Sequence, residues 1–563
     1  MRRLKVLGVV LAVCLVAAAC GSGSGATNST APPTNSSGVG GSVTLSNESG
    51  AYWTCQFNPF NGSVTDEAAG FIYESLMFVN VLQDDKTTPW LATGYSWSNA
   101  GRTLTFTIRS GVKWSDGTPF SAKDVLFTFQ LLKKNPALDL NSIWAVLNSV
   151  ALKGSNQIVL NFKTPAATYF YYVADQLPIV PEHIWASISK PVTYTDSHPI
   201  GTGPYLVHDC TGENIEYQRN PDYWQPGLPK IETVNYPAFT QNTAANEDLA
   251  FGKAQWGGQY IADIQGYYLS KNTTDYHDWF PPLQNVTLFP NLTDKLLSLP
   301  VREAISLGID RAKVSELGES GYEPPANQDG IVQPTFSSWN DSAYSSEYPY
   351  DPSKAETILE NAGYKKVNGV FQSPSGQPLS FSVVNIGDYP DWVADLTIIT
   401  DELAQIGIQL KVDELSSTTY DSDVYNGDFQ LAYDAETGGP TPYFELRQWL
   451  YGPNSAPIGQ TASTNWERFD ASTAGAESTT VDNLFNSYAA TTSLATQESI
   501  TDQLEHVMVA QVPVIPVVES VDWYEYDTAN LSGWPTQQNP YAQPSPYVVP
   551  DLEVVLLHLR WTK

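Results

Sequence analysis

Alternating apolar and polar positions predict a strand and a helix early in the chain. In LTFTIR (104–109) every second residue is apolar, which is typical of a strand with one buried face. Asp116-Gly117 then predicts a turn. Ser121 is followed three residues later by Asp124, a capping-box pattern that predicts the first turn of a helix. These features describe a scaffold and point to no chemistry by themselves.

Residues 379–415 have the pattern strand, helix, strand. LSFSVVN (379–385) and IQLKVDEL (408–415) read as strands, and residues 391–406 carry apolar side chains at helical spacing. Such a unit predicts two parallel strands joined by a right-handed crossover. DFQLAYD (428–434) predicts a further strand, so we expect a mixed α/β chain.

The C-terminal part contains three more elements. Residues 499–511 read as a helix that leads into VPVIPVVE (512–519), an apolar strand with two prolines. Proline cannot donate to a strand ladder, so this strand would sit poorly inside a sheet. The apolar run LEVVLLHLRW (552–561) predicts a strand that ties down the C-terminus.

Length and charge limit the class of protein. The chain has 563 residues, 42% of them hydrophobic, which corresponds to about three to four domains with sizeable cores. It carries 60 acidic and 29 basic residues, a formal net charge of −31. Nucleic acids and anionic lipid surfaces are bound by clustered Lys and Arg, so this balance argues against both.

The N-terminus has the features of a secretion signal. Met1–Lys5 is basic, and the fourteen apolar residues that follow are too few for a membrane-spanning helix. We expect residues 1–19 to be a signal peptide. Cys20 resembles the cysteine of a bacterial lipobox, although Ala17 stands where Leu is usual, and predicts lipidation. Residues 20–41 would then be a lipidated, flexible tether.

Only two cysteines follow Cys20. Cys55 and Cys210 form an even pair in a chain destined for an oxidising compartment, so we expect a disulfide between them. Two buried free thiols are the alternative. Neither cysteine belongs to a CxxC motif, which gives metal binding and redox catalysis little support.

Catalytic motifs are scarce. The six histidines are scattered and none falls in an HExxH spacing, and no GxxxxGK[ST] or GxSxG motif occurs. Gly201–Tyr205 begins like a phosphate-binding loop but lacks the third glycine. The paired carboxylates of a glycosidase are defined by their separation in space, so the sequence leaves such a pair open. We therefore expect no enzyme, no metal and no cofactor.

Aromatic residues supply the positive signal. Tryptophan and tyrosine recur, among amide, carboxylate and hydroxyl side chains, in segments that do not read as regular core elements. Aromatic faces with polar neighbours suit sugar rings or peptide side chains. Ordinary packing is the alternative for each. The residues concerned are Tyr52, Trp53, Trp256, Tyr260, Tyr443, Trp449, Trp523 and Tyr524.

Four segments together resemble a known family. Residues 108–129, 198–207, 217–234 and 299–314 are similar, in the same order, to the signature segments of family 5 extracytoplasmic solute-binding proteins. These proteins are the peptide, nickel and oligosaccharide receptors of ABC importers. The resemblance implies an α/β fold of the two-lobe periplasmic-binding-protein type (type II, in the large family 5 architecture). It also implies an extra α+β domain inserted in lobe I.

The resemblance further implies domain ranges and partners. We expect the chain to cross between lobes near Pro290-Asn291 and near Pro516. The expected partners are a small-molecule ligand and an ABC permease with its ATPases, for a monomer held on the outer face of the cell membrane by its lipid alone. The implied ranges are 42–69, 200–287 and 518–563 for lobe I, 70–199 for the extra domain and 288–517 for lobe II.

The ligand class is argued from one missing carboxylate. Peptide receptors of the family carry an Asp that pairs with the peptide amino terminus, and the corresponding position here is Gly438, although a shifted alignment could place Asp434 or Glu436 there. Residues 456–470 and 533–547 resemble the cellobiose-type oligosaccharide-binding branch. We therefore expect a β-linked oligosaccharide, with a peptide as the alternative and a secreted glycoside hydrolase as a remote one.

Candidate ligand contacts follow from residue type and from the inferred position in the fold. They are aromatic, amide, hydroxyl or carboxylate side chains. We expect contacts from Trp53, Asn58, Trp256, Tyr260, Asn291, Glu436, Thr437, Tyr443, Trp449 and Trp523.

Overall fold

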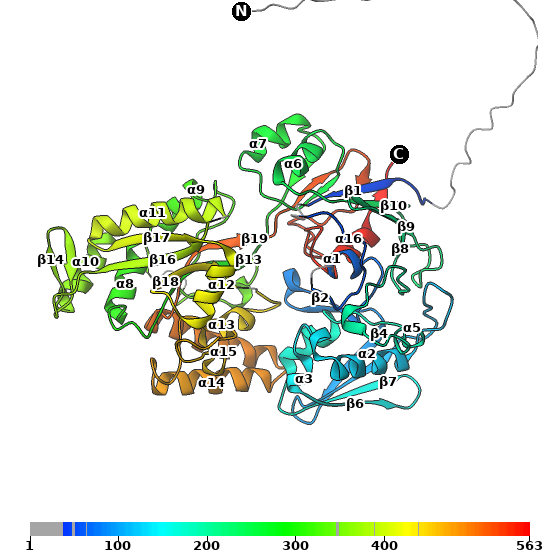
Figure 1. The fold of residues 1–563 in the computed structure, drawn as a ribbon, viewed down its shortest axis with the longest axis horizontal. Coiled ribbons are helices and arrows are strands. Elements are labelled where there is room, and N and C mark those ends of the chain that lie inside the picture. Colours follow the sequence, from blue (N-terminus) through cyan, green and yellow to red (C-terminus); the bar gives the residue numbers. More distant parts are fainter. Residues whose placement is uncertain (1–37, 48–50, 63–64, 345–347, 388, 437) are drawn as a thin grey trace, which may run out of the picture. The chain divides into compact units, whose positions relative to one another are not determined.

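A computed structural model describes residues 38–47, 51–62, 65–344, 348–387, 389–436 and 438–563 (Figure 1). The predicted signal peptide, the lipidation site Cys20, most of the predicted tether and Thr437 lie outside these residues. Among the described residues, none of the helices combines the length and the apolar character needed to cross a bilayer.

The largest sheet has seven strands. β1 lies near its middle and pairs in parallel with β10 and β11, whereas β8, β9 and β10 form antiparallel pairs. In spatial order the strands are β12 (Tyr276–Asp278), β20 (Glu525–Asp527), β11 (Trp256–Gly257), β1 (Ser42–Ser46), β10 (Thr233–Pro237), β9 (Asn214–Arg219) and β8 (Tyr205–Cys210).

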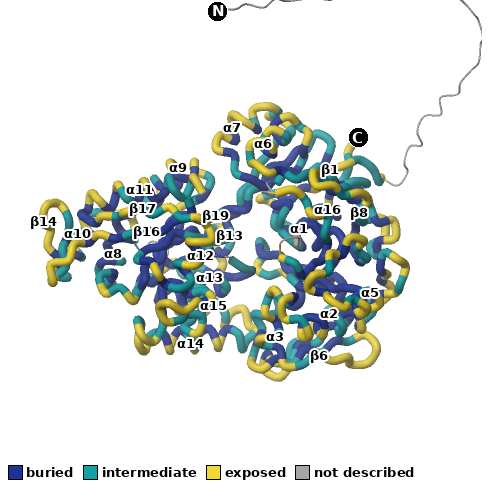
Figure 2. Tube along the Cα trace, viewed as in Figure 1, coloured by how far each residue is buried: buried dark blue, intermediate teal, exposed yellow. Residues whose placement is uncertain are grey.

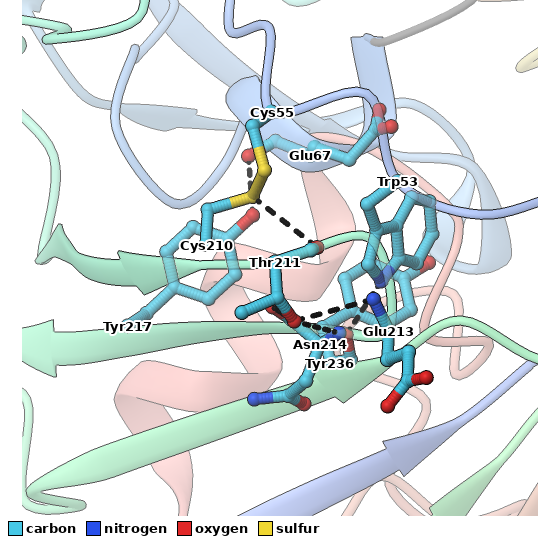
Figure 3. Close-up of a disulfide and its surroundings, with 9 residues drawn as sticks. All are labelled: Trp53, Cys55, Glu67, Cys210, Thr211, Glu213, Asn214, Tyr217 and Tyr236. Atoms are coloured by element: carbon cyan, nitrogen blue, oxygen red, sulfur yellow. Dashed lines mark hydrogen bonds between the residues drawn. A yellow bond between two sulfur atoms is a disulfide. The ribbon is translucent and has the colours of Figure 1, made fainter.

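A disulfide holds the loop after β1 against this sheet (Figure 3). Cys55 in the loop is bonded to Cys210 at the end of β8, which is the pair expected from the sequence. Trp53 in the same loop donates a hydrogen bond from Nε1 to the carbonyl of Tyr236, at 2.7 Å, and the two rings lie 4.7 Å apart. A covalent bond, a hydrogen bond and a ring contact therefore fix the loop.

A four-stranded antiparallel sheet contains the first predicted strand. The strand is β5, and the helix α2 (Ala122–Lys134) begins directly after Ser121. The Ser121 side chain accepts a hydrogen bond from a backbone N–H of the first turn, and Asp124 accepts one from the Ser121 N–H, so the predicted capping box is confirmed. The strand order is β4 (Ala92–Ser98), β5 (Thr103–Ile108), β7 (Gln157–Phe162), β6 (Leu147–Lys153).

A five-stranded sheet confirms the predicted crossover unit. β16 and β17 are parallel neighbours, joined through the helix α11 (Pro390–Ile406), and β18 is the further strand predicted from residues 428–434. The order is β17 (Gln409–Leu415), β16 (Ser380–Ile386), β18 (Leu431–Ala435), β13 (Pro282–Pro290), β19 (Ile515–Val521).

Both faces of the five-stranded sheet are buried at its centre. Neighbouring residues belong to different apolar clusters, with Leu288 and Val383 in one and Phe289 and Val384 in the other. The centre of this sheet is accordingly dark blue in Figure 2. β19 is an edge strand, and Pro516 pairs with Thr287 beside an irregularity in register. The expectation that its prolines avoid a central position is confirmed.

The predicted C-terminal strand is wrong for most of its length. Residues 552–558 belong to the helix α16 (Asp551–His558), and only the short β22 (Arg560–Trp561) is extended, paired with β21 (Leu531–Ser532). Every residue of α16 except His558 is buried. A helix buried on all sides has a continuous apolar sequence, which periodicity cannot distinguish from a buried strand.

The predicted crossing points are also displaced. The chain passes from the seven-stranded to the five-stranded sheet through residues 279–281, between β12 and β13, and returns through residues 522–524, between β19 and β20. Pro290 instead ends β13, and Pro516 lies within β19. The other lobe and domain boundaries stay predictions.

The remaining elements connect or cover these sheets. The small hairpins are β2 (Met77–Asn80) with β3 (Lys86–Pro89) and β14 (Lys365–Val367) with β15 (Val370–Gln372). The other helices are α1 (Thr65–Ala68), α3 (Ile143–Val146), α4 (Phe170–Ala174), α5 (Glu182–Trp185), α6 (Asn242–Ala250), α7 (Ile264–Tyr267), α8 (Leu299–Gly308), α9 (Arg311–Leu317), α10 (Pro352–Asn361), α12 (Ser417–Asn426), α13 (Pro442–Leu450), α14 (Ala476–Ala489) and α15 (Leu494–Gln511).

Candidate functional site

Three adjoining cavities lie where segments distant in sequence meet. The first, of about 130 Å³, shares Leu140, Asn141 and Gln176 with the second, of about 540 Å³. The second cavity also shares lining residues with a third cavity, of about 580 Å³. We call the three cavities together the groove. Some of its walls come from segments around the four-stranded sheet, among them α4. Others come from α13 and the residues just before it.

Aromatic rings lie at the boundary between the second cavity and the third. Tyr171 and Tyr172 on α4 meet Phe444 on α13, with ring centroids 5.9 and 5.8 Å apart and planes nearly perpendicular. Tyr171 and Phe444 line both cavities. Edge-to-face contacts of this kind are favourable without filling the space beside the rings.

The start of α13 fixes the position of Phe444. Pro442 occupies the first turn, where its missing N–H costs nothing. The next residue, Tyr443, is buried and stacks on Tyr488 of α14 with centroids 4.5 Å apart. The Tyr488 hydroxyl donates to Oγ1 of Thr441, the N-cap residue, at 3.1 Å. The first turn is therefore anchored, and Phe444 is held at the cavity wall.

The second cavity is polar but nearly uncharged. Among its sixteen described lining residues, Arg447 is the one charged side chain. The amide and hydroxyl side chains that line it are those of Asn141, Ser142, Thr168, Gln176, Gln448, Asn454, Ser463 and Thr464.

Two carboxyl groups of the neighbouring cavities have raised pKa values. Burial raises the pKa of Asp175, in the first cavity, to about 7, although the Gln176 side chain and the Val79 N–H both donate to it. Burial, with the neighbouring Asp84 carboxylate second, raises the pKa of Asp85 in the third cavity to about 8. At neutral pH these two groups therefore carry less negative charge than ordinary aspartates would.

Four of the predicted contacts lie in the core instead. Asn58 donates to the carbonyls of Pro191 and Tyr194, and Asn291 donates to those of Gly427 and Phe429. Trp256 and Trp449 are fully buried, and Nε1 of Trp256 donates to the carbonyl of Pro544. Asn58, Asn291 and Trp256 therefore have protein partners for their polar groups, and we place none of the four in the groove.

Two predicted residues form a separate aromatic cluster. The rings of Tyr260 and Trp523 lie 5.3 Å apart and both contact Tyr322, and Trp523 also contacts Phe280. The cluster lies at the two crossing segments between the sheets, and the Tyr260 hydroxyl is 3.1 Å from Oγ of Ser320. It does not line the groove cavities.

The remaining predicted residues lie in different parts of the structure. Tyr443 lines the second cavity, and so does Gly438, next to the undescribed Thr437. Trp53 packs beside the disulfide. Glu436 is 3% exposed, and within the described part of the chain neither of its carboxyl oxygens has a hydrogen-bond partner. Burial, followed by the charge of Glu467, raises its pKa well above the usual value.

Sequence reasoning missed the aromatic residues of α4 and of the position just before it. Tyr169, Tyr171 and Tyr172 all line the second cavity. The available signal was the run TYFYYV (168–173), in which four consecutive aromatic residues fit neither the alternation of a strand nor the spacing of an amphipathic helix.

Comparison with known proteins identifies the family. Residues 86–457 match the family described as bacterial extracellular solute-binding proteins, family 5 Middle. The chain belongs to family 5 of the bacterial extracellular solute-binding proteins. The resemblance inferred from four sequence segments is thereby confirmed at the level of the family.

The similar proteins differ in what their names say they bind. The glutathione-binding protein GsiB of Salmonella typhi is 27% identical over 362 residues, which cover 62% of this chain. The match spans about 65% of the length of that relative. This chain can therefore be aligned with about two thirds of that relative, and not with its whole length.

Solved structures support the fold over almost the whole chain. A periplasmic oligopeptide-binding protein of Thermotoga maritima has a TM-score of 0.82 at 24% identity, covering 92% of this chain and 99% of the other. The mannohexaose-bound structure of the same T. maritima protein has a TM-score of 0.74 at 23% identity, covering 92% and 98%. The fold is thus the α/β architecture of family 5 binding proteins, as expected.

Proposed function

We propose that this family 5 protein is the extracytoplasmic receptor of an ABC importer and binds a β-linked, cellobiose-like oligosaccharide in the groove. The observation that carries the proposal is the second cavity. Its lining combines aromatic rings with eight amide and hydroxyl side chains and a single charge. Sugars present flat apolar faces and many hydroxyl groups, which such a lining matches. The mannohexaose-bound relative supports the same ligand class.

The groove also suits a ligand that couples separate parts of the chain. Its lining combines residues of the predicted extra domain with residues of predicted lobe II, and the first cavity adds Phe60 and Val549 from predicted lobe I. A ligand that contacts all three favours their approach and shifts the protein toward a closed state. In this proposal the closed, monomeric receptor, anchored through lipidated Cys20, delivers the ligand to the permease.

A peptide is the second candidate ligand. Glu436 and Glu467 are buried, and within the described residues their carboxyl oxygens lack hydrogen-bond partners. Glu436 lies two residues before Gly438 of the second cavity. A peptide ammonium group could pair with such a carboxylate and lower its pKa. The name of the glutathione-binding relative fits this alternative, as does the name of the T. maritima protein whose other structure holds mannohexaose.

Calorimetric titration distinguishes an oligosaccharide receptor from a peptide receptor and from a glycoside hydrolase. Mannohexaose, cellopentaose, glutathione and a tripeptide are titrated into the mature protein. The proposal expects saturable binding of at least one oligosaccharide and unchanged sugar afterwards. Binding of the peptides alone would establish the second candidate. Release of shorter sugars would instead establish the glycoside hydrolase.

A further inference from the structure

Arg447 is an isolated cation in the groove. It is the one charged residue among the sixteen described residues that line the second cavity, in a chain whose formal net charge is −31. It lies in the last turn of α13 and is half-buried. Its guanidinium carbon is 4.3 Å from the ring centre of Tyr451. A guanidinium stacked on a ring keeps its five N–H donors directed outward along its edge.

Those donors have no protein acceptor in the described part of the chain. No hydrogen bond or ion pair joins the Arg447 guanidinium to any of these residues, although acids outnumber bases about twofold. Asp482 is near enough for the Arg447 charge to oppose the rise in its pKa that burial causes. The carboxylate of Asp482 instead accepts a hydrogen bond from the Gly452 N–H, at 2.8 Å.

Arg447 lines the same cavity as the tyrosine rings that wall it. Burial raises the pKa of Tyr169 and of Tyr172, and the Arg447 charge opposes both rises. Burial also raises the pKa of Tyr443, again opposed first by Arg447. The cation therefore sits where a ligand stacked beside these tyrosines would present its substituents.

We infer that Arg447 binds a carboxylate group of the ligand, so that the protein prefers acidic ligands to neutral ones of the same shape. An unpaired guanidinium beside neutral polar groups matches the planar geometry of a carboxylate, which it can bind through two parallel hydrogen bonds. The carboxylate can belong to a uronate sugar or to a peptide C-terminus. This inference rests on the proposed function, because it takes the groove as the ligand site.

Two matched pairs of probes test the inference and distinguish the two sources. Mannohexaose and hexamannuronate share a backbone and differ in hydroxymethyl against carboxylate groups. A tripeptide and its C-terminal amide differ in one carboxylate. Dissociation constants are measured by calorimetry at low salt for the wild type, for Arg447→Met and for Lys123→Met, which removes one exposed charge from α2.

The wild type and the Lys123 control should bind one acidic probe about tenfold or more tightly than its neutral partner. Arg447→Met should abolish that ratio. The preference in the wild type should also fall as salt rises, a measurement that needs no variant. Arg447→Lys should retain part of the preference for the acidic probe, because the positive charge stays. It should lose the rest, because lysine cannot form the two parallel hydrogen bonds.

The outcomes are distinguishable. A uronate preference lost in Arg447→Met supports the inference together with the oligosaccharide proposal. A preference for the free peptide acid, lost in the same variant, supports the inference and rejects the sugar. Equal affinity within a bound pair, or a preference that survives Arg447→Met, overturns the inference and leaves the receptor proposal standing. Failure of all four probes to bind overturns the inference, and failure of cellopentaose to bind as well overturns the receptor proposal.

Discussion

At the scale of single residues, Phe444 makes the clearest contribution to the proposed site. Its ring meets Tyr171 and Tyr172 from a distant part of the chain, and it lines two of the three cavities. The stack of Tyr443 on Tyr488 holds the backbone behind it. Phe444 is therefore exposed to a ligand while its neighbour is fixed in the core.

We expect Phe444→Ala to weaken binding of the oligosaccharide by roughly 1–3 kcal/mol, because a stacking surface in a desolvated site is lost. Calorimetric titration of wild type and variant measures the difference. Phe251→Ala removes an aromatic ring that is 71% exposed and lies outside the groove, so its affinity should equal that of the wild type. Equal affinity of Phe444→Ala and wild type would remove this ring from the site.

Residue type alone could not separate ligand contacts from core residues. Asn58 and Asn291 have the chemistry of sugar-binding amides, but each is saturated by backbone carbonyls. That distinction depends on tertiary contacts, which the sequence does not contain. Tyr443 lines the second cavity, whereas Tyr171 was not predicted, because its run of four aromatic residues has neither the period of a strand nor that of a helix.

At the scale of elements, the disulfide determines the conformation of the loop after β1. Cys55 and Cys210 are separated by 155 residues, so the bond closes a long loop of chain. In the chain-entropy account, a cross-link stabilises by limiting the unfolded ensemble, and more so for longer loops. The loop carries Asn58 and Phe60, and Phe60 lines the first cavity.

Reduction of the disulfide should lower the free energy of unfolding by about 2–5 kcal/mol. Urea denaturation with and without a thiol reductant measures this effect. The double variant Cys55→Ser with Cys210→Ser should match the reduced wild type and should not respond to reductant. A reductant effect in the double variant, or none in the wild type, would contradict the structural role of the bond.

Elements with a complete local signal could be predicted, and those without one could not. The capping box at Ser121 and the helical spacing of α11 are local features, and both elements are confirmed. The apolar run of α16 has no period because the helix is buried on all sides. The crossings between sheets were misplaced because Pro290 and Pro516 fit a strand end and an edge strand as well as a crossover.

At the scale of the whole molecule, the formal charge overstates the charge of the folded protein. Many carboxyl groups are buried, and burial raises their pKa above the usual range. Burial raises the pKa of Asp434 to about 7, of Glu445 and Glu505 to about 8, and of Glu519 to about 9. The sequence could supply the count of acids, but their protonation depends on the fold.

We expect stability to fall as pH rises from 5 to 8.5. An acid with a raised pKa keeps its proton in the folded state and loses it in the unfolded state, so the folded state binds more protons over this range. Each such group then lowers the free energy of unfolding by up to about 1.4 kcal/mol per pH unit between its unfolded and folded pKa. Urea denaturation at several pH values measures the slope.

Glu519→Gln provides the matched variant for this slope. The side chain is 1% exposed, and Oε1 accepts a hydrogen bond from the Gln333 N–H, which an amide oxygen can also accept. The variant cannot titrate, so it should lose less stability than the wild type between pH 5 and 8.5. Stability that rises with pH in the wild type would show instead that the buried acids are ionised and paired.

The central claim is the place of the ligand, and hydrogen exchange with and without saturating mannohexaose tests it most directly. The account predicts that the sugar slows exchange in peptides covering residues 138–144, 168–177 and 438–451, which line the groove. Unchanged exchange throughout, or protection confined to the cluster around Tyr260 and Trp523, would contradict it.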